Sequence, residues 1–236
     1  FYCFFFLIPY FAVRKNLYYS MNLNRIKLLP IFLVIASTLF FIILNAPVIE
    51  WNKSVSFPEF MSSFESWALL KEKQLESLTI YLVSFDNNFE YLIGIIAIAI
   101  IPGFCEEFFF RGILQKNLRQ LIKNPHFAII ISSLLFSAFH LQFYGFFPRL
   151  FLGIFFGYLF YWSGSLIYPV IAHAFNNFLS LTVFYAATSG LFGDDFDLSV
   201  NSSPDIPLAV IVFSIFIFIF LVSVLKEKFR DNNEPG

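Results

Sequence analysis

The chain has 236 residues, of which 58% are hydrophobic and only 13% are charged, whereas soluble domains carry about 25% charged residues. So few charges cannot cover a surface that faces water, which excludes an ordinary soluble domain. The net charge of −1 gives no electrostatic basis for a nucleic-acid partner. We therefore predict an all-α, polytopic transmembrane bundle with membrane lipid around it.

Apolar stretches of about 17 to 25 residues, long enough to cross a bilayer, recur along the chain. Residues 1–13 are expected to be the remainder of a first span whose start is missing. The mixed, charged segment 51–88 carries apolar residues at helical spacing, which predicts an extramembrane helical hairpin or a surface helix. Further spans are expected at 28–49, 89–104, 126–141, 146–162, 166–188 and 207–225.

Basic residues gather in three of the polar segments that separate these spans. They lie at 14–27, at 116–123 and in the polar tail 226–236. The positive-inside rule assigns all three to the cytoplasm and the acidic segment 194–205 to the other side. We expect an integral membrane protein of a bacterial inner membrane, with its C-terminus in the cytoplasm.

Several ionisable or strongly polar residues interrupt these apolar helices. A charge at the centre of a span costs about 2.5–3.5 kcal/mol on insertion scales, so such residues usually serve a function. The candidates are Glu106, Glu107, Arg111, His140, His173 and Asn177.

Helical spacing divides these candidates into two groups. Glu107 and Arg111 are four residues apart, so they share a face and are expected to form a structural ion pair. Glu106 lies about 100° around the helix from Glu107, so it faces the site instead. His173 and Asn177 also share a face, and two neutral donors side by side suit the stabilisation of an oxyanion.

Other residues near these positions receive weaker assignments. Arg149 lies early in its span, where it can snorkel to the outer interface. Phe136 shares a face with His140 and is expected to pack. Cys105 is also assigned to packing, and Asn176 is expected to point elsewhere on its helix.

Three motifs in this order resemble those of a known family. Glu106-Glu107-x-x-x-Arg111, Phe136-x-x-x-His140 and His173-x-x-x-Asn177 are similar to the motifs of the CPBP intramembrane peptidases. That family includes type II CAAX prenyl proteases and the bacteriocin-processing, Abi-like proteins. The resemblance covers residues 89 to 184, within a predicted catalytic transmembrane domain 89–225 that follows the N-terminal region 1–88.

The resemblance implies a membrane endopeptidase related to enzymes that remove the last three residues after a prenylated cysteine. Glu106 would be the general base, and His140 would help to orient the water. His173 and Asn177 would bind the carbonyl oxygen, while Glu107 and Arg111 would hold the helix. The partner would be a peptide or protein with a C-terminal or membrane-embedded cleavage site, prenylated or not.

Cofactor use and overall role each leave an alternative open. We favour water activation without a cofactor, with zinc held by Glu106, His140 and His173 as the alternative, since a catalytic zinc takes three protein ligands. The rival roles are a non-proteolytic scaffold or bacteriocin immunity factor of the same family and, with less support, a transporter. A transporter would favour repeated halves or paired broken helices, and the sequence has neither.

Overall fold

The computed structural model describes residue 22 and residues 26–189 and 206–231. Every regular element within these residues is a helix, and five of the helices are long and apolar enough to cross a membrane. The predicted all-α, polytopic architecture is confirmed, and the chain is an integral membrane protein. The expected first span 1–13 and the acidic segment 194–205 lie outside the described residues.

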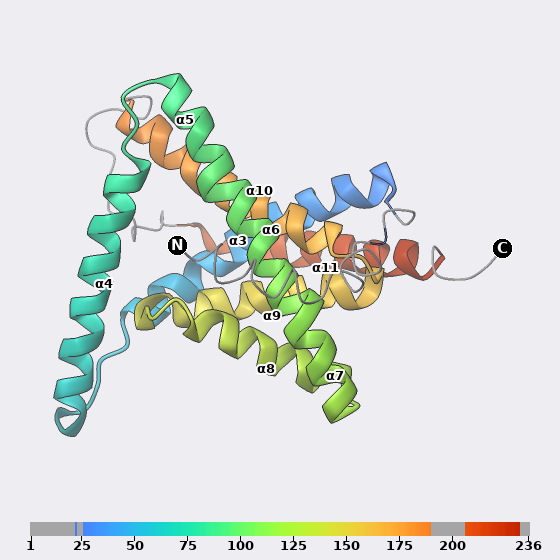
Figure 1. Cartoon of the computed structure of the whole chain (residues 1–236), viewed down its shortest axis with the longest axis horizontal. Helices are drawn as coiled ribbons and strands as arrows, with labels where there is room; N and C mark the ends of the chain where they lie inside the picture. Colours follow the sequence, from blue (N-terminus) through green and yellow to red (C-terminus); the bar gives the residue numbers. More distant parts are fainter. Residues whose placement is uncertain (1–21, 23–25, 190–205, 232–236) are drawn as a thin grey trace.

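Two long apolar helices, α3 (Leu28–Lys53) and α11 (Leu208–Asp231), pack against each other beside α9. Both also appear together in Figure 1. Helix α11 runs six residues beyond the expected end of its span at 225. The reason is burial: Phe229 is only 2% exposed and packs on Tyr168 of α10.

The segment 51–88, expected to be a helical hairpin or a surface helix, begins with the end of α3 and then forms a short 3₁₀ turn and one long helix. The turn η2 covers Glu59–Met61, and α4 covers Ser62–Val83. Helix α4 stands apart from the bundle at one side in Figure 1. It exposes apolar side chains such as Trp67 and Leu70 while keeping Ala68 buried.

The helix that carries the glutamates is a continuous run of 35 residues from Asn88 to Ile122. It comprises α5 (Asn88–Gly94), η3 (Ile95–Ile100), α6 (Ile101–Glu107), η4 (Phe108–Gln115) and α7 (Lys116–Ile122). Segments η3 and η4 are π-helical, so the two glutamates lie between widened turns. Such turns commonly occur at functional sites. Pro102 lies between the two π-helical segments.

A glycine sets how closely this helix approaches α10 (Ile167–Thr188). A Cβ at Gly103 would lie 3.0 Å from the backbone nitrogen of Ala174, which is tighter than ordinary contact. The missing side chain lets the two backbones meet at the residue next to His173. The sequence thus brings the Glu106–Glu107 pair and His173 together by close packing.

Helix α8 (Pro125–Ala138) is shorter than expected. Asn124 caps its start by accepting hydrogen bonds from two backbone N–H groups. It ends at Ala138, so His140 lies in the following turn rather than inside a helix, and Leu141 there adopts a positive φ of 55°. A second 3₁₀ turn, η5 (Phe143–Gly145), then leads into α9 (Phe146–Ser163).

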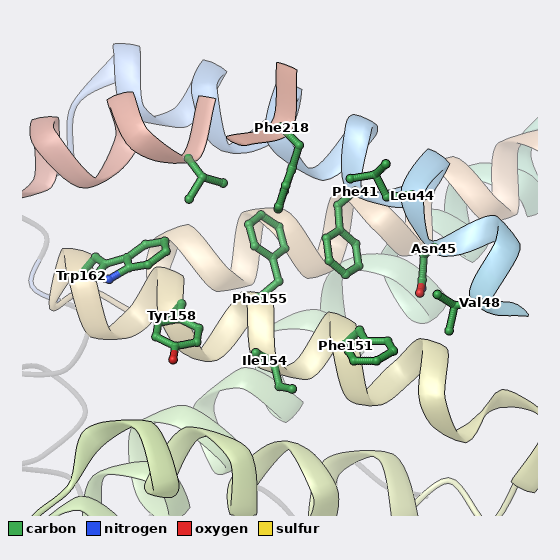
Figure 2. A pocket seen from close by; sticks show the side chains of 11 residues that line it. Phe41, Leu44, Asn45, Val48, Phe151, Ile154, Phe155, Tyr158, Trp162 and Phe218 are labelled. Carbon is green, nitrogen blue, oxygen red and sulfur yellow. The ribbon is translucent and has the colours of Figure 1, made fainter. Parts of the chain in front are cut away.

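An apolar groove runs along one face of α9, between that helix, α3 and α11. Figure 2 shows its aromatic lining, with Phe41 of α3 and Phe155 of α9 stacked at 5.1 Å between ring centroids. The groove contains none of the candidate site residues. Phe156, the neighbour of Phe155, faces His173 instead, so the groove and the polar site occupy different faces of α9.

Candidate active site

A buried ion pair forms the base of the site. The Nε of Arg111 donates to Oε2 of Glu107 at 2.9 Å, and both side chains are fully buried. Each charge stabilises the other in the apolar interior, because an unpaired buried charge costs about 3–5 kcal/mol. The pairing expected from their spacing is therefore present in the fold.

Helix α8 adds further contacts to Arg111. Its Nη1 donates to Oγ of Ser132 at 3.3 Å, and Ser132 in turn donates to the carbonyl oxygen of Phe110. The guanidinium carbon lies 5.3 Å from the centre of the Phe136 ring, within the range of a cation–π interaction. We call Glu107, Arg111 and Ser132 the Arg111 cluster; it joins the glutamate helix to α8.

Glu106 faces the two histidines, as its position on the helix predicts. Its Oε2 lies 3.9 Å from Nε2 of His140 and 3.8 Å from Nε2 of His173. These separations are too long for direct hydrogen bonds. The structure thus brings together side chains from three different elements, with a small gap between one carboxylate oxygen and two imidazole nitrogens.

The geometry fixes the tautomer of neutral His140. Its Nδ1 lies 2.9 Å from the carbonyl oxygen of Phe136. A carbonyl oxygen only accepts, so Nδ1 carries the proton and donates. The neutral ring therefore presents the lone pair of Nε2 towards Glu106. The ring also packs edge-on against Phe136, as expected for a packing residue at that position.

His173 is held more tightly than the sequence indicates. Its Nδ1 lies 2.9 Å from Oε1 of Glu107, and its ring stacks on Phe156 at 5.2 Å between centroids. Phe136 meets the ring edge-on. Glu107 therefore binds Arg111 with one oxygen and His173 with the other. It thus pairs with Arg111 on its own helix and also links that helix to α10.

Asn177 lies one turn after His173 and contacts a different part of the glutamate helix. Its Nδ2 approaches the carbonyl oxygen of Ile98 at 3.5 Å, at the limit of a hydrogen bond. Its Oδ1 accepts from Nδ2 of Asn176 at 3.2 Å. Asn176 was expected to point elsewhere, so this contact corrects that expectation: the neighbouring amide orients Asn177.

The spacing of the site can be compared with that of a zinc site. Ligands at about 2.0–2.1 Å from a tetrahedral zinc lie roughly 3.3–3.5 Å from one another. The distances from Glu106 to the two histidines, 3.8 and 3.9 Å, are wider. Within the described residues, no three His, Cys, Asp or Glu side chains are arranged to hold a metal ion.

Arg149 is the polar residue whose position the sequence did not indicate. Snorkelling was expected, but Nη1 is buried, and Nη2 donates to Oε1 of Gln142. Gln142 then donates from Nε2 to Oε1 of Glu72 on α4 at 3.3 Å. The Arg149 charge also interacts with Glu106 and His140. The sequence offers one signal for this residue: a cation in the first turn of a helix is energetically unfavourable, because it opposes the helix dipole.

Two further residues, Cys105 and His126, have partners of their own. Cys105 is 6% exposed and packs in an apolar cluster with Phe110 and Phe136. His126 lies at the start of α8, and its Nδ1 is 2.8 Å from the hydroxyl oxygen of Tyr158.

Comparison with known proteins supports the relationship that the motifs indicate. Residues 88–179 match the family model described as type II CAAX prenyl endopeptidase, Rce1-like. No curated protein and no solved structure matches the chain. The matched segment contains the glutamate helix, α8, α9 and the part of α10 with His173 and Asn177. Residues 88–179 of this membrane protein are therefore similar to the Rce1-like type II CAAX prenyl endopeptidases.

Proposed function

We propose that the protein is an intramembrane endopeptidase that hydrolyses a peptide bond near the C-terminus of a membrane-associated, prenylated substrate. The observation that carries the proposal is the convergence of Glu106, His140 and His173 on one gap. The Oε2 atom of Glu106 lies 3.9 Å from Nε2 of His140 and 3.8 Å from Nε2 of His173. A water molecule in this gap is the nucleophile.

The gap has the width that one water molecule requires. Two acceptors that each bind the same water at about 2.8 Å lie roughly 3.5–4.5 Å apart. The lone pair on Nε2 of His140 and Oε2 of Glu106 are two such acceptors. Together they hold both water protons and direct the oxygen lone pair outwards, and Glu106 removes one proton as the oxygen attacks the carbonyl carbon.

The oxygen of the attacked carbonyl becomes negative and needs donors. Because Nδ1–H of His173 donates to Glu107, a second donor at Nε2 requires the doubly protonated ring. The carboxylates 2.9 and 3.8 Å away are suitable counter-ions for such a cation. This refines the expectation of a neutral donor. The amide of Asn177 supplies the other hydrogen bond, and Glu106 returns its proton to the leaving nitrogen as the C–N bond breaks.

We further propose that this chemistry proceeds without a metal. The support is the spacing of the donor set, which is wider than a tetrahedral zinc site and suits a bridging water. Both imidazoles also donate from Nδ1 to protein oxygens, an arrangement that holds either a base or a ligand in place. Incubation with EDTA is expected to leave activity unchanged; loss of activity that zinc restores would contradict this part.

The basic ends of the helices support one orientation in the membrane. The backbone N–H of Lys27 donates to the hydroxyl of Tyr168, and Tyr168 packs on Phe229 near the basic end of α11. The starts of α3 and α10 and the end of α11 therefore lie at one end of the bundle. We propose that this end faces the cytoplasm of a bacterial cell, which places the C-terminus there.

The direct test is cleavage by the purified protein in lipid nanodiscs of a peptide ending in S-farnesylcysteine and three apolar residues. Glu106→Gln keeps the size of the side chain but removes the base. We expect kcat to fall by about 10²- to 10⁴-fold, the usual contribution of general acid–base catalysis. Mass spectrometry of both products identifies the bond that is cut.

The matched control is Glu59→Gln, which neutralises an exposed glutamate in η2. It is expected to cleave as fast as the wild type. If Glu106→Gln also retains wild-type activity, water activation by Glu106 is wrong. If neither the purified wild type nor the membranes of a producing cell release a shortened terminus, the protein is a scaffold or immunity factor rather than a peptidase.

A further inference from the structure

A second cluster of polar residues lies beside the site and has no role in the proposed reaction. It consists of Arg149 at the start of α9, Gln142 in the preceding turn and Glu72 on α4. We call it the Arg149 cluster. Gln142 bridges the other two, since its amide oxygen accepts from Arg149 and its amide nitrogen donates to Glu72. The guanidinium is therefore hydrogen-bonded to a neutral group only.

The charge of Arg149 is not neutralised by a direct partner. None of the ion pairs among the described residues includes it. Its Nη1 is buried and has no hydrogen-bond partner there. Glu72 and Glu106, the carboxylates with which its charge interacts, each have a buried Oε2 that also lacks a hydrogen bond. Arg149 thus lies between two carboxylates and contacts neither.

The position of Arg149 is fixed by the fold. Asn45 of α3 donates to the carbonyl oxygen of Pro148, and Ser137 at the end of α8 donates to that of Phe146. These bonds join the first turn of α9 to α3 and to the chain that leads into His140. The guanidinium also lies against Gly145, where any Cβ would come within 2.4 Å of Nη1. The fold therefore fixes both the start of α9 and the space around the Arg149 charge.

Such an arrangement is energetically unfavourable without a ligand. An arginine in the first turn opposes the helix dipole, and a buried donor without a partner costs about 1–3 kcal/mol. Arginine binds a carboxylate through two parallel N–H donors, which is among the strongest polar contacts in proteins. A ligand carboxylate would satisfy Nη1 and neutralise the charge in one step.

The proposed reaction supplies a ligand of this kind, and the inference rests on that function. A substrate cut three residues from its end carries a free α-carboxylate about 10 Å from the scissile bond when extended. We infer that Arg149 binds this C-terminal carboxylate, so that the enzyme locates the bond by its distance from the free end. Arg149 is then a specificity-determining residue, and the substrates are peptides with an unblocked C-terminus.

The test compares two farnesylated peptides that differ only at the end, one a free acid and the other its C-terminal amide. Wild-type enzyme is expected to cleave the acid with a kcat/KM at least about tenfold higher, mainly through KM, since a charged hydrogen bond is lost in the amide. In Arg149→Gln the KM for the acid rises to that of the amide, and the ratio falls to near one. Arg149→Lys, which keeps the charge but loses the fork, is expected to lie between them.

The control is Arg119→Gln, because Arg119 stacks on Tyr161 of α9, outside the site. It should keep the wild-type preference for the acid. If wild type cleaves both peptides equally, or if Arg149→Gln slows both by the same factor, the inference is wrong while the peptidase function stands. Size-exclusion profiles and melting temperatures of all variants identify any that fail to fold.

Binding separates this inference from the proposed chemistry. Glu106→Gln protein is titrated with the same two peptides, and affinity is measured by fluorescence anisotropy. Tighter binding of the acid that Arg149→Gln abolishes supports carboxylate recognition even if no cleavage is ever seen. Equal binding of acid and amide overturns it even if the wild type is an active peptidase.

Discussion

The Arg111 cluster and the Arg149 cluster each contain a guanidinium at the site, but the two are satisfied differently. Arg111 has an ionised carboxylate at 2.9 Å, a serine hydroxyl and an aromatic face. Among the residues that the structure describes, Arg149 donates only to the amide oxygen of Gln142. A charge whose partners are all inside the protein serves the fold, whereas a charge without its counter-ion is available to a ligand. The difference assigns one arginine to structure and the other to recognition.

The largest expected effect comes from breaking the Arg111 cluster. Arg111→Met keeps much of the side-chain volume but leaves Glu107 as a buried carboxylate without its ion pair. Removal of one partner of a buried pair costs about 3–5 kcal/mol, so we expect a large fall in the melting temperature, with loss of activity following. Thermal unfolding in detergent, followed by circular dichroism, measures it.

The matched variant for that comparison is Arg149→Met. It removes a charge that has no carboxylate partner, so its melting temperature should stay much closer to that of the wild type. A loss of stability as large as that of Arg111→Met would mean that both arginines are structural. The contrast between the clusters would then fail.

The second expected effect concerns the contact that joins the two motifs. Gly103→Ala adds a methyl group 3.0 Å from the backbone nitrogen of Ala174. Backbone cannot yield as a side chain can, so α6 and α10 must separate by a few tenths of an ångström. Overpacking of this kind costs about 1–3 kcal/mol. It should also lower kcat, because the hydrogen bond between Glu107 and His173 spans the same interface.

Gly112→Ala is the control on the same helix. A Cβ there would meet Cδ1 of Leu166 at 3.1 Å, which is a side-chain atom that can rotate away. Stability and kcat are expected to stay near the wild-type values. If the two alanine variants behave alike, the approach of α6 to α10 does not determine the geometry of the site.

Local spacing predicted much of this site, and longer-range packing supplied the rest. The Glu107–Arg111 pair and the orientation of Glu106 follow from the helical repeat, because residues four apart share a face. The hydrogen bond from His173 to Glu107 joins residues 66 positions apart. It depends on the rotation of two helices and on π-helical turns that no residue pattern marks. His140 was assigned to a helix that in fact ends at Ala138.

The Arg149 cluster could not be predicted for a similar reason. Its three members come from α4, the segment just before η5 and the first turn of α9. No spacing rule relates residues 72, 142 and 149, and snorkelling is the usual behaviour of an arginine near the end of a span. Only the tertiary fold shows that the chain covers this arginine and places Gln142 against it.

The smallest expected effect concerns Glu72, the carboxylate that Gln142 links to Arg149. Burial raises the pKa of Glu72 above its usual value of 4.5, and the nearby Arg149 charge only partly offsets this. An acid whose pKa is raised on folding destabilises the folded state at pH values above that pKa, and the penalty disappears as falling pH protonates it.

Glu72→Gln should therefore raise the melting temperature slightly at pH 7.5, while its amide oxygen can still accept from Gln142. The difference from the wild type should vanish as the pH falls below 4.5, and the exposed Glu59→Gln variant provides the background for loss of one negative charge. A lower melting temperature for Glu72→Gln at pH 7.5 would mean that Glu72 is already the counter-ion of Arg149, which would close the second cluster and remove its distinction from the first.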